Sequence, residues 1–346
     1  MEETKNKSLK IALDTMGGDF APRNEILGAI EVFNDSNFSK NLEIVFYGDE
    51  EKIKNVLKET PHNKLKYSIV HTDEVISMLD DPTESIKTKK NSSLYRGIES
   101  VAKGDANAFV SAGNTGAVMS ISTVLMHRIK GVSRPTIATF IPSDNIYPVL
   151  IIDAGANVDC KPLFLYEFAV MGNIYVKQLL GIERPRVGLL SIGEEEKKGN
   201  EAVREAHKLI KNDKSLNFIG NVEGKDILSG NCDIVVCDGF TGNVILKLAE
   251  SFAGFVKKKF KDYANNNIKN KILVGVAMPA LKSVFASFNY EDYGGVPLLG
   301  VNGVTIIGHG KSTPKAIKNM IIRAVESVQK QVNIKIEKAL NEEIIS

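Results

Sequence analysis

The amino-acid sequence predicts an α/β fold built on a mixed, mostly parallel sheet. Short apolar runs typical of buried strands alternate with longer segments whose apolar residues recur at helical spacing. Polar, glycine-containing loops follow several of these runs, as they do in strand-loop-helix units. A turn-like segment, Pro-Ser-Asp-Asn at residues 142–145, lies between two apolar runs and indicates one antiparallel pair.

The N-terminal half begins with repeated strand-loop-helix units. Residues 9–13 are apolar except for Lys10 and predict a strand, and Pro22 suits the first turn of the helix that follows. Further strands are predicted at residues 43–47, 66–70, 108–110 and 136–141. Parallel pairing is favoured, because a crossover helix joins parallel neighbours.

The stretch at residues 149–162 organises the second half. Its first four residues (VLII) predict a strand buried on both faces, and Pro162 suits the start of the next helix. In open α/β sheets, ligands bind beyond the carboxyl ends of strands, so Asn157, Asp159 and Lys161 lie where chemistry is expected. Later strands are predicted at residues 187–192, 216–219, 234–237 and 304–307.

Two long helices are predicted at residues 244–260 and 268–288, with a break or kink near Pro279. The second keeps one face apolar over several turns. Representative apolar residues are Ile272, Leu273, Val276, Leu281 and Phe285. A helical hairpin at residues 244–288 fits packing against a second subunit or contact with a membrane interface.

Composition excludes several classes of protein. The 346 residues carry 44 basic and 42 acidic side chains, a net charge of +2, so neither a disordered chain nor a nucleic-acid-binding protein is indicated. Cys160, Cys232 and Cys237 give an odd number without C-x-x-C spacing, which argues against a disulfide framework or zinc site and favours the cytoplasm. No apolar stretch is long enough to span a bilayer.

Familiar catalytic motifs are missing. The dinucleotide-binding motif G-x-G-x-x-G and the serine-hydrolase motif G-x-S-x-G do not occur. Residues 308–312 resemble only the end of a Walker A nucleotide-binding loop, because Thr305 stands where the first glycine of that loop is required. Cys160 beside Lys161 could be a thiolate nucleophile, but packing of a small side chain is favoured. The spacing of Asp14, Asp19 and Asp153 does not demand a metal, so neither metal nor cofactor is predicted.

The composition of the strand ends suits an anionic ligand. Glycine, asparagine, aspartate, serine and threonine recur there, and freed backbone N–H groups at helix N-termini bind phosphate or carboxylate. Ordinary turn chemistry would need the same residues. His309 could donate a hydrogen bond or proton to a substrate, or it could cap the following helix.

Taken together, the strand-end loops resemble those of the bacterial phosphate acyltransferases, which convert acyl-[acyl-carrier-protein] and inorganic phosphate into acyl phosphate. The resemblance runs from about residue 9 to residue 330. Its motifs are DTMGGD (14–19), KKNSS (89–93), SAGNTGA (111–117), DAGANVDCKP (153–162), GLLSIGEEEKKGN (188–200), GNVEG (220–224), DGFTGN (238–243), YGGVPLLGVNG (293–303) and IGHG (307–310). Thr15 and Val296 depart from the family's usual residues.

The resemblance implies a three-layer fold like that of the isocitrate and isopropylmalate dehydrogenases, with a protruding helical hairpin. It implies a cytoplasmic homodimer in phospholipid synthesis, with peripheral contact to the inner face of the cell membrane and to a downstream membrane glycerol-3-phosphate acyltransferase. Residues 1–8 would be an N-terminal extension, residues 9–332 a single catalytic unit with room for two lobes, and residues 333–346 a C-terminal tail.

The implied site residues fall into three groups. The expected catalytic residues are Lys161, His309, Asn157 and Asp159. Phosphate and substrate are expected at Ser92, Ser93, Gly113, Asn114, Thr115, Asp238, Thr241 and Asn243. Docking of the acidic carrier protein is expected at Lys87, Lys89 and Lys90. The alternatives are a short-chain phosphotransacylase that uses acyl-coenzyme A, an isopropylmalate-type dehydrogenase and a non-enzymatic membrane scaffold.

Overall fold

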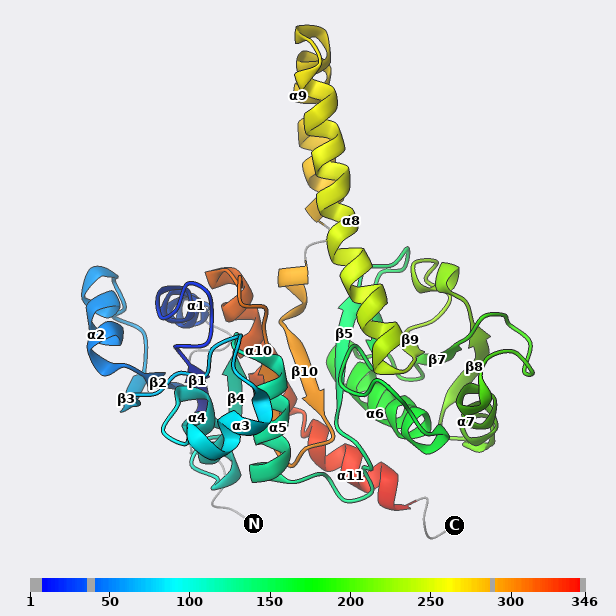
Figure 1. Ribbon diagram of the computed structural model, residues 1–346, viewed down its shortest axis with the longest axis horizontal. Helices are drawn as coiled ribbons and strands as arrows, with labels where there is room; N and C mark the ends of the chain where they lie inside the picture. Colours follow the sequence, from blue (N-terminus) through cyan, green and yellow to red (C-terminus); the bar gives the residue numbers. More distant parts are fainter. Residues whose placement is uncertain (1–7, 36–40, 287–289, 343–346) are drawn as a thin grey trace.

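The computed structural model describes residues 8–35, 41–286 and 290–342 and shows a single sheet with helices on both faces (Figure 1). The sheet has 11 strands in the order β3-β2-β1-β4-β11-β10-β5-β6-β9-β7-β8. The strands are β1 (Leu9–Asp14), β2 (Leu42–Gly48), β3 (Tyr67–His71), β4 (Ala108–Ser111), β5 (Thr136–Ile141), β6 (Val149–Ile152), β7 (Arg186–Leu190), β8 (Asn217–Val222), β9 (Ile234–Val236), β10 (Val296–Leu299) and β11 (Val304–Ile307).

The sheet is mixed and mostly parallel, as predicted. Strands β3, β2, β1, β4 and β11 pair in parallel, and so do β6, β9, β7 and β8. Antiparallel pairs of β10 with β11, β10 with β5 and β5 with β6 join these two blocks. The antiparallel pair expected around residues 142–145 is therefore confirmed, whereas β10 is a strand that the sequence did not predict.

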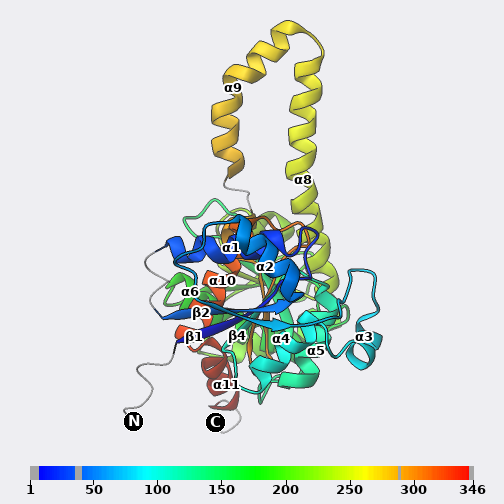
Figure 2. The same ribbon diagram turned by 90° about the vertical axis from the view of Figure 1, so that its left-hand side faces the viewer.

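Helices cover both faces of the sheet (Figure 2). One side carries α1 (Arg23–Asn34), α2 (Glu50–Glu59), α6 (Pro162–Leu180), α7 (Glu201–Asn212) and α10 (Pro314–Gln329). The other carries α4 (Ser93–Ala102), α5 (Thr115–Met126) and the base of α8 (Gly239–Asn265). The short helix α3 (Pro82–Thr88) contacts α5. Apolar residues of α4 and α5, such as Leu94 and Ile121, are buried against the sheet, which fixes the N-terminal ends of these helices at its edge.

The C-terminal residues differ from the expectation of a tail. Residues 332–342 form α11 (Val332–Glu342), and Val332, Ile336 and Leu340 are buried in the same core cluster as α6. Their spacing of four residues places them on one face of the helix, so this segment contributes to the core. The expected N-terminal extension lies outside the described residues except for Ser8.

The hairpin projects from the body of the protein (Figure 1). It consists of α8 and α9 (Ile268–Ala286), and Pro279 lies inside α9, which Figure 2 shows bent. Of the predicted apolar residues, Ile272, Leu273 and Val276 are 63%, 52% and 78% exposed. Leu281 is half-buried, and the side chain of Phe285 lies outside the described residues. No helix in the described ranges has the length and apolar character needed to cross a bilayer.

Candidate active site

Asp14 anchors the first strand-end loop. Its carboxyl group is buried at the end of β1, where Oδ1 accepts from the Met16 N–H (3.0 Å) and Oδ2 accepts from the Ser111 hydroxyl (2.7 Å). The same Ser111 oxygen accepts from the Gly113 N–H (2.9 Å). Burial raises the Asp14 pKa, and hydrogen bonds from Ser111 and Ser93 oppose that rise. Asp14 therefore ties the loop after β1 to the loop after β4.

The predicted binding residues of α4 and α5 are mainly helix caps. Ser92 accepts from the Tyr95 N–H and donates to Lys89 O (2.7 Å). Asn114 accepts from the Ala117 N–H (3.1 Å). These bonds occupy the side-chain oxygens with the helices' own N–H groups. Each helix presents its positive N-terminal end to the strand-end loops.

Asn114 also holds a neighbouring loop. Its Nδ2 donates to Ser77 O (3.1 Å) and Asp80 O (3.2 Å), so the side chain is 8% exposed and bonded at both ends. Gly113 is buried beside it, whereas Thr115, the first residue of α5, is exposed. Of these residues, only Thr115 has a side chain at the surface.

His309 lies at the carboxyl end of β11 and is exposed. Its Nδ1 accepts from the Lys311 N–H (3.1 Å), and its carbonyl accepts from the Ser312 N–H and hydroxyl. Because Nδ1 is an acceptor, the neutral ring carries its proton on Nε2, which leaves an N–H donor directed away from this turn. The following helix, α10, is capped by Thr313, so the alternative that His309 caps it is wrong. The bond of His309 within its own turn is compatible with a donor role.

A second buried aspartate anchors the loop after β6. Both oxygens of Asp153 accept from the loop: Oδ1 from the Gly155 and Ala156 N–H groups, and Oδ2 from the N–H and Nδ2 of Asn157. Asn157 Nδ2 also donates to Pro135 O (2.9 Å). Both amide hydrogens of Asn157 are thus engaged within the protein, and only its Oδ1 remains for a ligand.

The N-terminus of α8 lies against this loop. Asp238 caps the helix, accepting from the Thr241 N–H (2.8 Å) and hydroxyl (2.9 Å), and the Gly239 N–H donates to Asn157 O (2.7 Å). Asn243 is exposed on the next turn, close to Gly155. Three other predicted residues thus surround the Asn157 loop.

Asp159 and Lys161 are exposed between this loop and α6, with Lys161 at the N-cap of the helix. Cys160 lies between them half-buried, and its thiol donates to Asn157 O (3.6 Å). Burial raises the Cys160 pKa to about 12. The group is therefore a neutral thiol near pH 7, as expected for a packing residue rather than a nucleophile.

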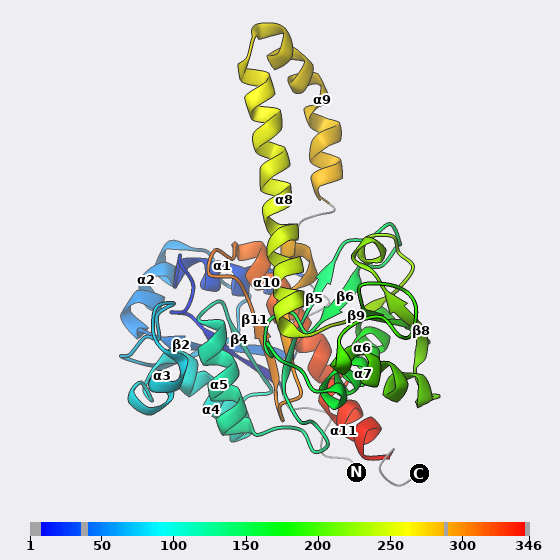
Figure 3. The same ribbon diagram turned by 45° about the vertical axis from the view of Figure 1, so that its right-hand side comes forward.

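The predicted residues thus form two groups, one beyond each block of parallel strands. Ser92, Ser93, Asn114 and His309 belong to the first, and Asn157, Asp238 and Thr241 to the second. Ala154, in the second group's loop, shares a buried cluster with Ala117 and Val118 of α5. Figure 3 shows α5 and the base of α8 on the same side of the sheet. The two helix N-termini therefore belong to one face of the molecule.

The predicted docking lysines differ from one another. Lys87 and Lys90 are exposed. Lys89 is half-buried, with Nζ 2.6 Å from Asp80 Oδ2 and 2.9 Å from Val75 O. The Lys89 ion pair fixes the loop at residues 75–80, so Lys87 and Lys90 are the cations more accessible to a partner.

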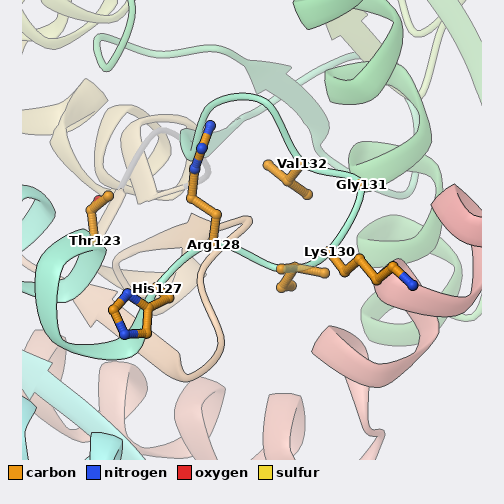
Figure 4. A pocket seen from close by; sticks show the side chains of 7 residues that line it. Thr123, His127, Arg128, Lys130, Gly131 and Val132 are labelled. Carbon is orange, nitrogen blue, oxygen red and sulfur yellow. The ribbon is translucent and has the colours of Figure 1, made fainter.

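Two cavities lie away from these residues. One, of about 390 Å³, is lined by Thr123, His127, Arg128 and the following loop to Val132. Figure 4 shows His127, Arg128 and Lys130 pointing in different directions, so their charges do not converge on one ligand position. The other, of about 330 Å³, lies between α4 and strands β1 to β3 and is lined partly by Arg96 and Tyr47. Within the described ranges, no cluster of three or more His, Cys, Asp or Glu side chains is arranged to hold a metal ion.

Sequence reasoning did not assign the anchoring roles of Asp14, Asp153 and Ser111. The available signal was an aspartate that ends or directly follows a mainly apolar strand, in DTMGGD and DAGAN. A carboxylate at such a position can accept several backbone N–H groups and fix the loop. Glu25 in α1, which is also buried, gave no signal, because its neighbours in the sequence are those of an ordinary helix.

Comparisons with known proteins agree with the motifs. Residues 9–335 match the family described as "Fatty acid synthesis protein". A protein named phosphate acyltransferase from Dictyoglomus turgidum is 44% identical over 96% of this chain and 98% of its own length. One of the same name from Thermodesulfovibrio yellowstonii is 47% identical over 96% of this chain and 95% of its own length.

Solved structures show the same fold. A phosphotransacetylase from Streptococcus pyogenes superimposes with a TM-score of 0.64, covering 94% of this chain and 95% of its own, at 16% identity. A phosphotransacetylase from Staphylococcus aureus gives 0.62, covering 93% and 94%, at 15% identity. The likeness of fold, the full-length match and the order of the strand-end motifs lead to one conclusion. This chain belongs to the phosphate acyltransferase family.

Proposed function

We propose that this acyltransferase moves a fatty acyl group from acyl-[acyl-carrier-protein] to inorganic phosphate, giving acyl phosphate for phospholipid synthesis. The observation that carries the proposal is the identity of 44% and 47% to proteins named phosphate acyltransferase over nearly the whole chain. This identity favours acyl transfer over a dehydrogenase reaction and over a non-enzymatic scaffold. The fold, of the isocitrate and isopropylmalate dehydrogenase type in our proposal, is compatible with several chemistries and does not select one.

The proposed reaction is direct attack of phosphate on the thioester. A phosphate oxygen forms a bond to the carbonyl carbon, and the carbonyl oxygen becomes a tetrahedral oxyanion. The oxyanion then re-forms the carbonyl, the C–S bond breaks with its electron pair leaving on sulfur, and the thiolate takes up the proton that hydrogen phosphate loses when it becomes acyl phosphate. Phosphate is itself the nucleophile, so no acyl-enzyme is required, and the raised pKa of Cys160 is consistent with this pathway. The protein must position two anionic reactants and stabilise the oxyanion.

The donors proposed for the oxyanion and the leaving thiolate are His309 and Lys161. The acceptor role of His309 Nδ1 leaves Nε2 as an N–H donor. Lys161 is exposed at the N-cap of α6 and carries a full positive charge beside the Asn157 loop. Exposed Asp159 lies two residues before it and would orient the ammonium group.

Phosphate is proposed to bind at the N-terminal ends of α5 and α8. Their caps, Asn114 and Asp238, are bonded to their own helices, so the attraction would come from the helix ends and from exposed Thr115 and Asn243. Ser92 and Ser93 would act less directly, by fixing α4 and the Asp14 loop.

The test is release of free carrier thiol by the purified protein, measured with and without phosphate. We expect release to require phosphate and to fall by about 10²–10³ in kcat for His309→Ala and for Lys161→Ala, because each removes a donor to developing charge. Glu337→Gln, at an exposed position on α11, serves as the control and should retain full activity. Near-normal turnover of both alanine variants at saturating phosphate would refute the assigned roles.

The identity of the acyl donor distinguishes this proposal from its alternative, a short-chain phosphotransacylase that uses acyl-coenzyme A. The same assay is run with long-chain acyl-carrier protein and with short-chain acyl-coenzyme A. A higher kcat/KM for the carrier thioester supports the proposed function. A higher kcat/KM for the short-chain coenzyme A thioester supports the alternative.

The hairpin of α8 and α9 is proposed to mediate homodimer formation and contact with the cytoplasmic face of the membrane. The observation behind this is the exposure of Ile272, Leu273 and Val276 on an element that projects from the protein (Figure 1). A membrane contact would also bring the acyl phosphate close to a membrane glycerol-3-phosphate acyltransferase, the proposed consumer of the product.

A further inference from the structure

The buried carboxylate of Asp153 accepts hydrogen bonds from several N–H groups of the loop that follows it. The side chain is 0% exposed, and the N–H groups of Gly155, Ala156 and Asn157 donate to it at 3.0, 2.8 and 2.8 Å. Asn157 Nδ2 adds a further bond of 2.8 Å. Burial raises the pKa of this carboxyl group, and these hydrogen bonds oppose the rise. Because every one of these partners is a donor, the site fits a carboxylate and no group that itself carries N–H.

The main chain around Asp153 is joined to β9, the strand that leads into α8. The Asp153 N–H donates to Cys237 O (3.0 Å), and the Cys237 N–H donates to Ile152 O (2.8 Å). On the far side of the loop, the Gly239 N–H donates to Asn157 O (2.7 Å). The loop at residues 153–157 is thus bonded both to the end of β9 and to the first residue of α8.

Two glycines let α8 approach this loop closely. A Cβ atom at Gly242 would lie 1.8 Å from Asp153 O, and one at Gly239 would lie 2.7 Å from Asn157 N and O. Such separations are far below van der Waals contact, so any larger residue would displace the helix. The first turn of α8 therefore rests on the loop that the Asp153 carboxylate holds.

We propose that Asp153 is a positioning residue that sets the place of the α8 N-terminus through the loop at residues 155–157, so that phosphate binding depends on it. This inference rests on the proposed function, which assigns phosphate to that helix end. Asp153 does not touch phosphate; it acts through Asn157 O and the Gly239 N–H. Displacing the helix end moves its N–H groups away from the anion, and their attraction depends on that separation.

Asp153→Asn tests the proposal, with Asp233→Asn as a matched control. The asparagine side chain has nearly the same volume as aspartate, but its N–H₂ group cannot accept the hydrogen bonds that the N–H groups of residues 155–157 donate. Asp233 is also buried, 6% exposed, and pairs with Arg186 at 2.8 Å, but it lies before β9, at the opposite end of that strand from α8. Both variants remove a buried carboxylate in the same half of the sheet.

Three quantities are measured for each protein: the phosphate Kd by calorimetry, kcat/KM for phosphate, and hydrogen exchange of the Gly155, Ala156 and Asn157 amides. For Asp153→Asn we expect phosphate Kd to rise about 30-fold or more and these amides to exchange at least about tenfold faster. KM for the acyl carrier should change less than about threefold. Asp233→Asn should lower the unfolding temperature without changing phosphate Kd or these amides.

A phosphate Kd for Asp153→Asn that matches Asp233→Asn overturns the proposal, as does unchanged exchange of the three amides. If Asp153→Asn yields no folded protein, Gly242→Ala decides, because its methyl group displaces the helix while the carboxylate remains. A raised phosphate Kd in Gly242→Ala supports the proposal, and an unchanged one overturns it. Wild-type protein that binds phosphate but releases no thiol refutes the proposed function and leaves the role of Asp153 measurable by calorimetry.

Discussion

At the scale of single residues, Glu25 is the clearest case of a buried ionisable group that the proposed chemistry does not use. It lies in the first turn of α1 with its side chain 1% exposed, beneath the loop that contains Gly18. Its Oε2 has no hydrogen-bond partner among the described residues. Burial, with a smaller contribution from Asp14, raises the Glu25 pKa to about 8. The group therefore holds its proton near pH 7.

This raised pKa predicts that stability falls as pH rises. Between the ordinary pKa of 4.5 and the folded value of about 8, the unfolded chain has lost the Glu25 proton while the folded protein retains it. Glu25 therefore lowers the free energy of unfolding across this window, by an amount on the order of a few kcal/mol at its upper end. Glu25→Gln should be more stable than wild type at about pH 8 and should show a flatter dependence of Tm on pH.

The measurement is thermal unfolding followed across that pH range for the wild type, Glu25→Gln and the exposed-site control Glu337→Gln. The control should reproduce the wild-type slope. Parallel curves for all three proteins would mean that Glu25 ionises normally in the folded state.

Cys160 gives a second prediction at this scale. Its thiol is neutral near pH 7, because burial raises its pKa to about 12, and the proposed reaction needs no thiolate. Cys160→Ala should retain kcat within about threefold of wild type, since only a half-buried packing group is lost. Loss of phosphate-dependent thiol release by about 10³ or more in a folded Cys160→Ala protein would instead indicate an acyl-enzyme.

At the scale of secondary-structure elements, helix caps explain how far the site could be predicted. Serine, asparagine and aspartate at strand ends marked the loops that the structure brings together. Ser92, Asn114 and Asp238 turned out to bond to their own helices, a role that produces the same residue preferences as ligand binding. Sequence alone could not separate these roles, because the cap bond depends on a local backbone geometry that only the fold defines.

Lys89 is bonded to the loop at residues 75–80, whereas Lys87 and Lys90 are exposed, and this difference gives a prediction for carrier docking. Lys87→Glu and Lys90→Glu together should raise KM for the acyl carrier several-fold, by an amount that decreases with added salt, and leave KM for acyl-coenzyme A unchanged. The control is Lys58→Glu on α2, which is also exposed. An equal effect of all these substitutions would show that overall charge, and not this surface, governs the carrier's KM.

The hairpin prediction concerns α9. Val276 is 78% exposed, and a charge at this position should prevent its burial against lipid. Val276→Glu is therefore expected to reduce binding to vesicles of anionic phospholipid by about tenfold, measured by flotation. Ile334→Glu places the same charge on α11, where Ile334 is 61% exposed, and should bind like wild type. Equal binding of the two variants would show that the hairpin does not contact the membrane.

At the scale of the whole molecule, the alternation of strands and helices predicted the sheet and its antiparallel pair at β5 and β6. The order of the strands could not be predicted, because β11 pairs with β4 across nearly two hundred residues of chain. Strand β10 was missed because Val296–Leu299 is short and contains Pro297. Helix α11 was missed because its buried residues, Val332, Ile336 and Leu340, alternate with polar ones at the end of the chain.

The two blocks of parallel strands also explain why the candidate site divides into two groups. Each block ends in an aspartate-anchored loop, with Asp14 at the end of β1 and Asp153 directly after β6, and each loop lies beside the N-terminus of a helix on the same face of the sheet. The proposed enzyme would use both groups, because phosphate is placed at the N-termini of α5 and α8 and the two donors, His309 and Lys161, come one from each group. Because both groups lie on the same face of the sheet, a single protein molecule could bring the two reactants together.

The most direct test of acyl transfer to phosphate follows the phosphorus atom. Purified protein is incubated with long-chain acyl-carrier protein and phosphate labelled with ¹⁸O, and the products are observed by ³¹P NMR while free thiol is measured. We predict an acyl phosphate resonance that appears in step with thiol release and retains all of the oxygen label, because a phosphate oxygen attacks the carbonyl carbon. Thiol release that yields free fatty acid without acyl phosphate would contradict the account.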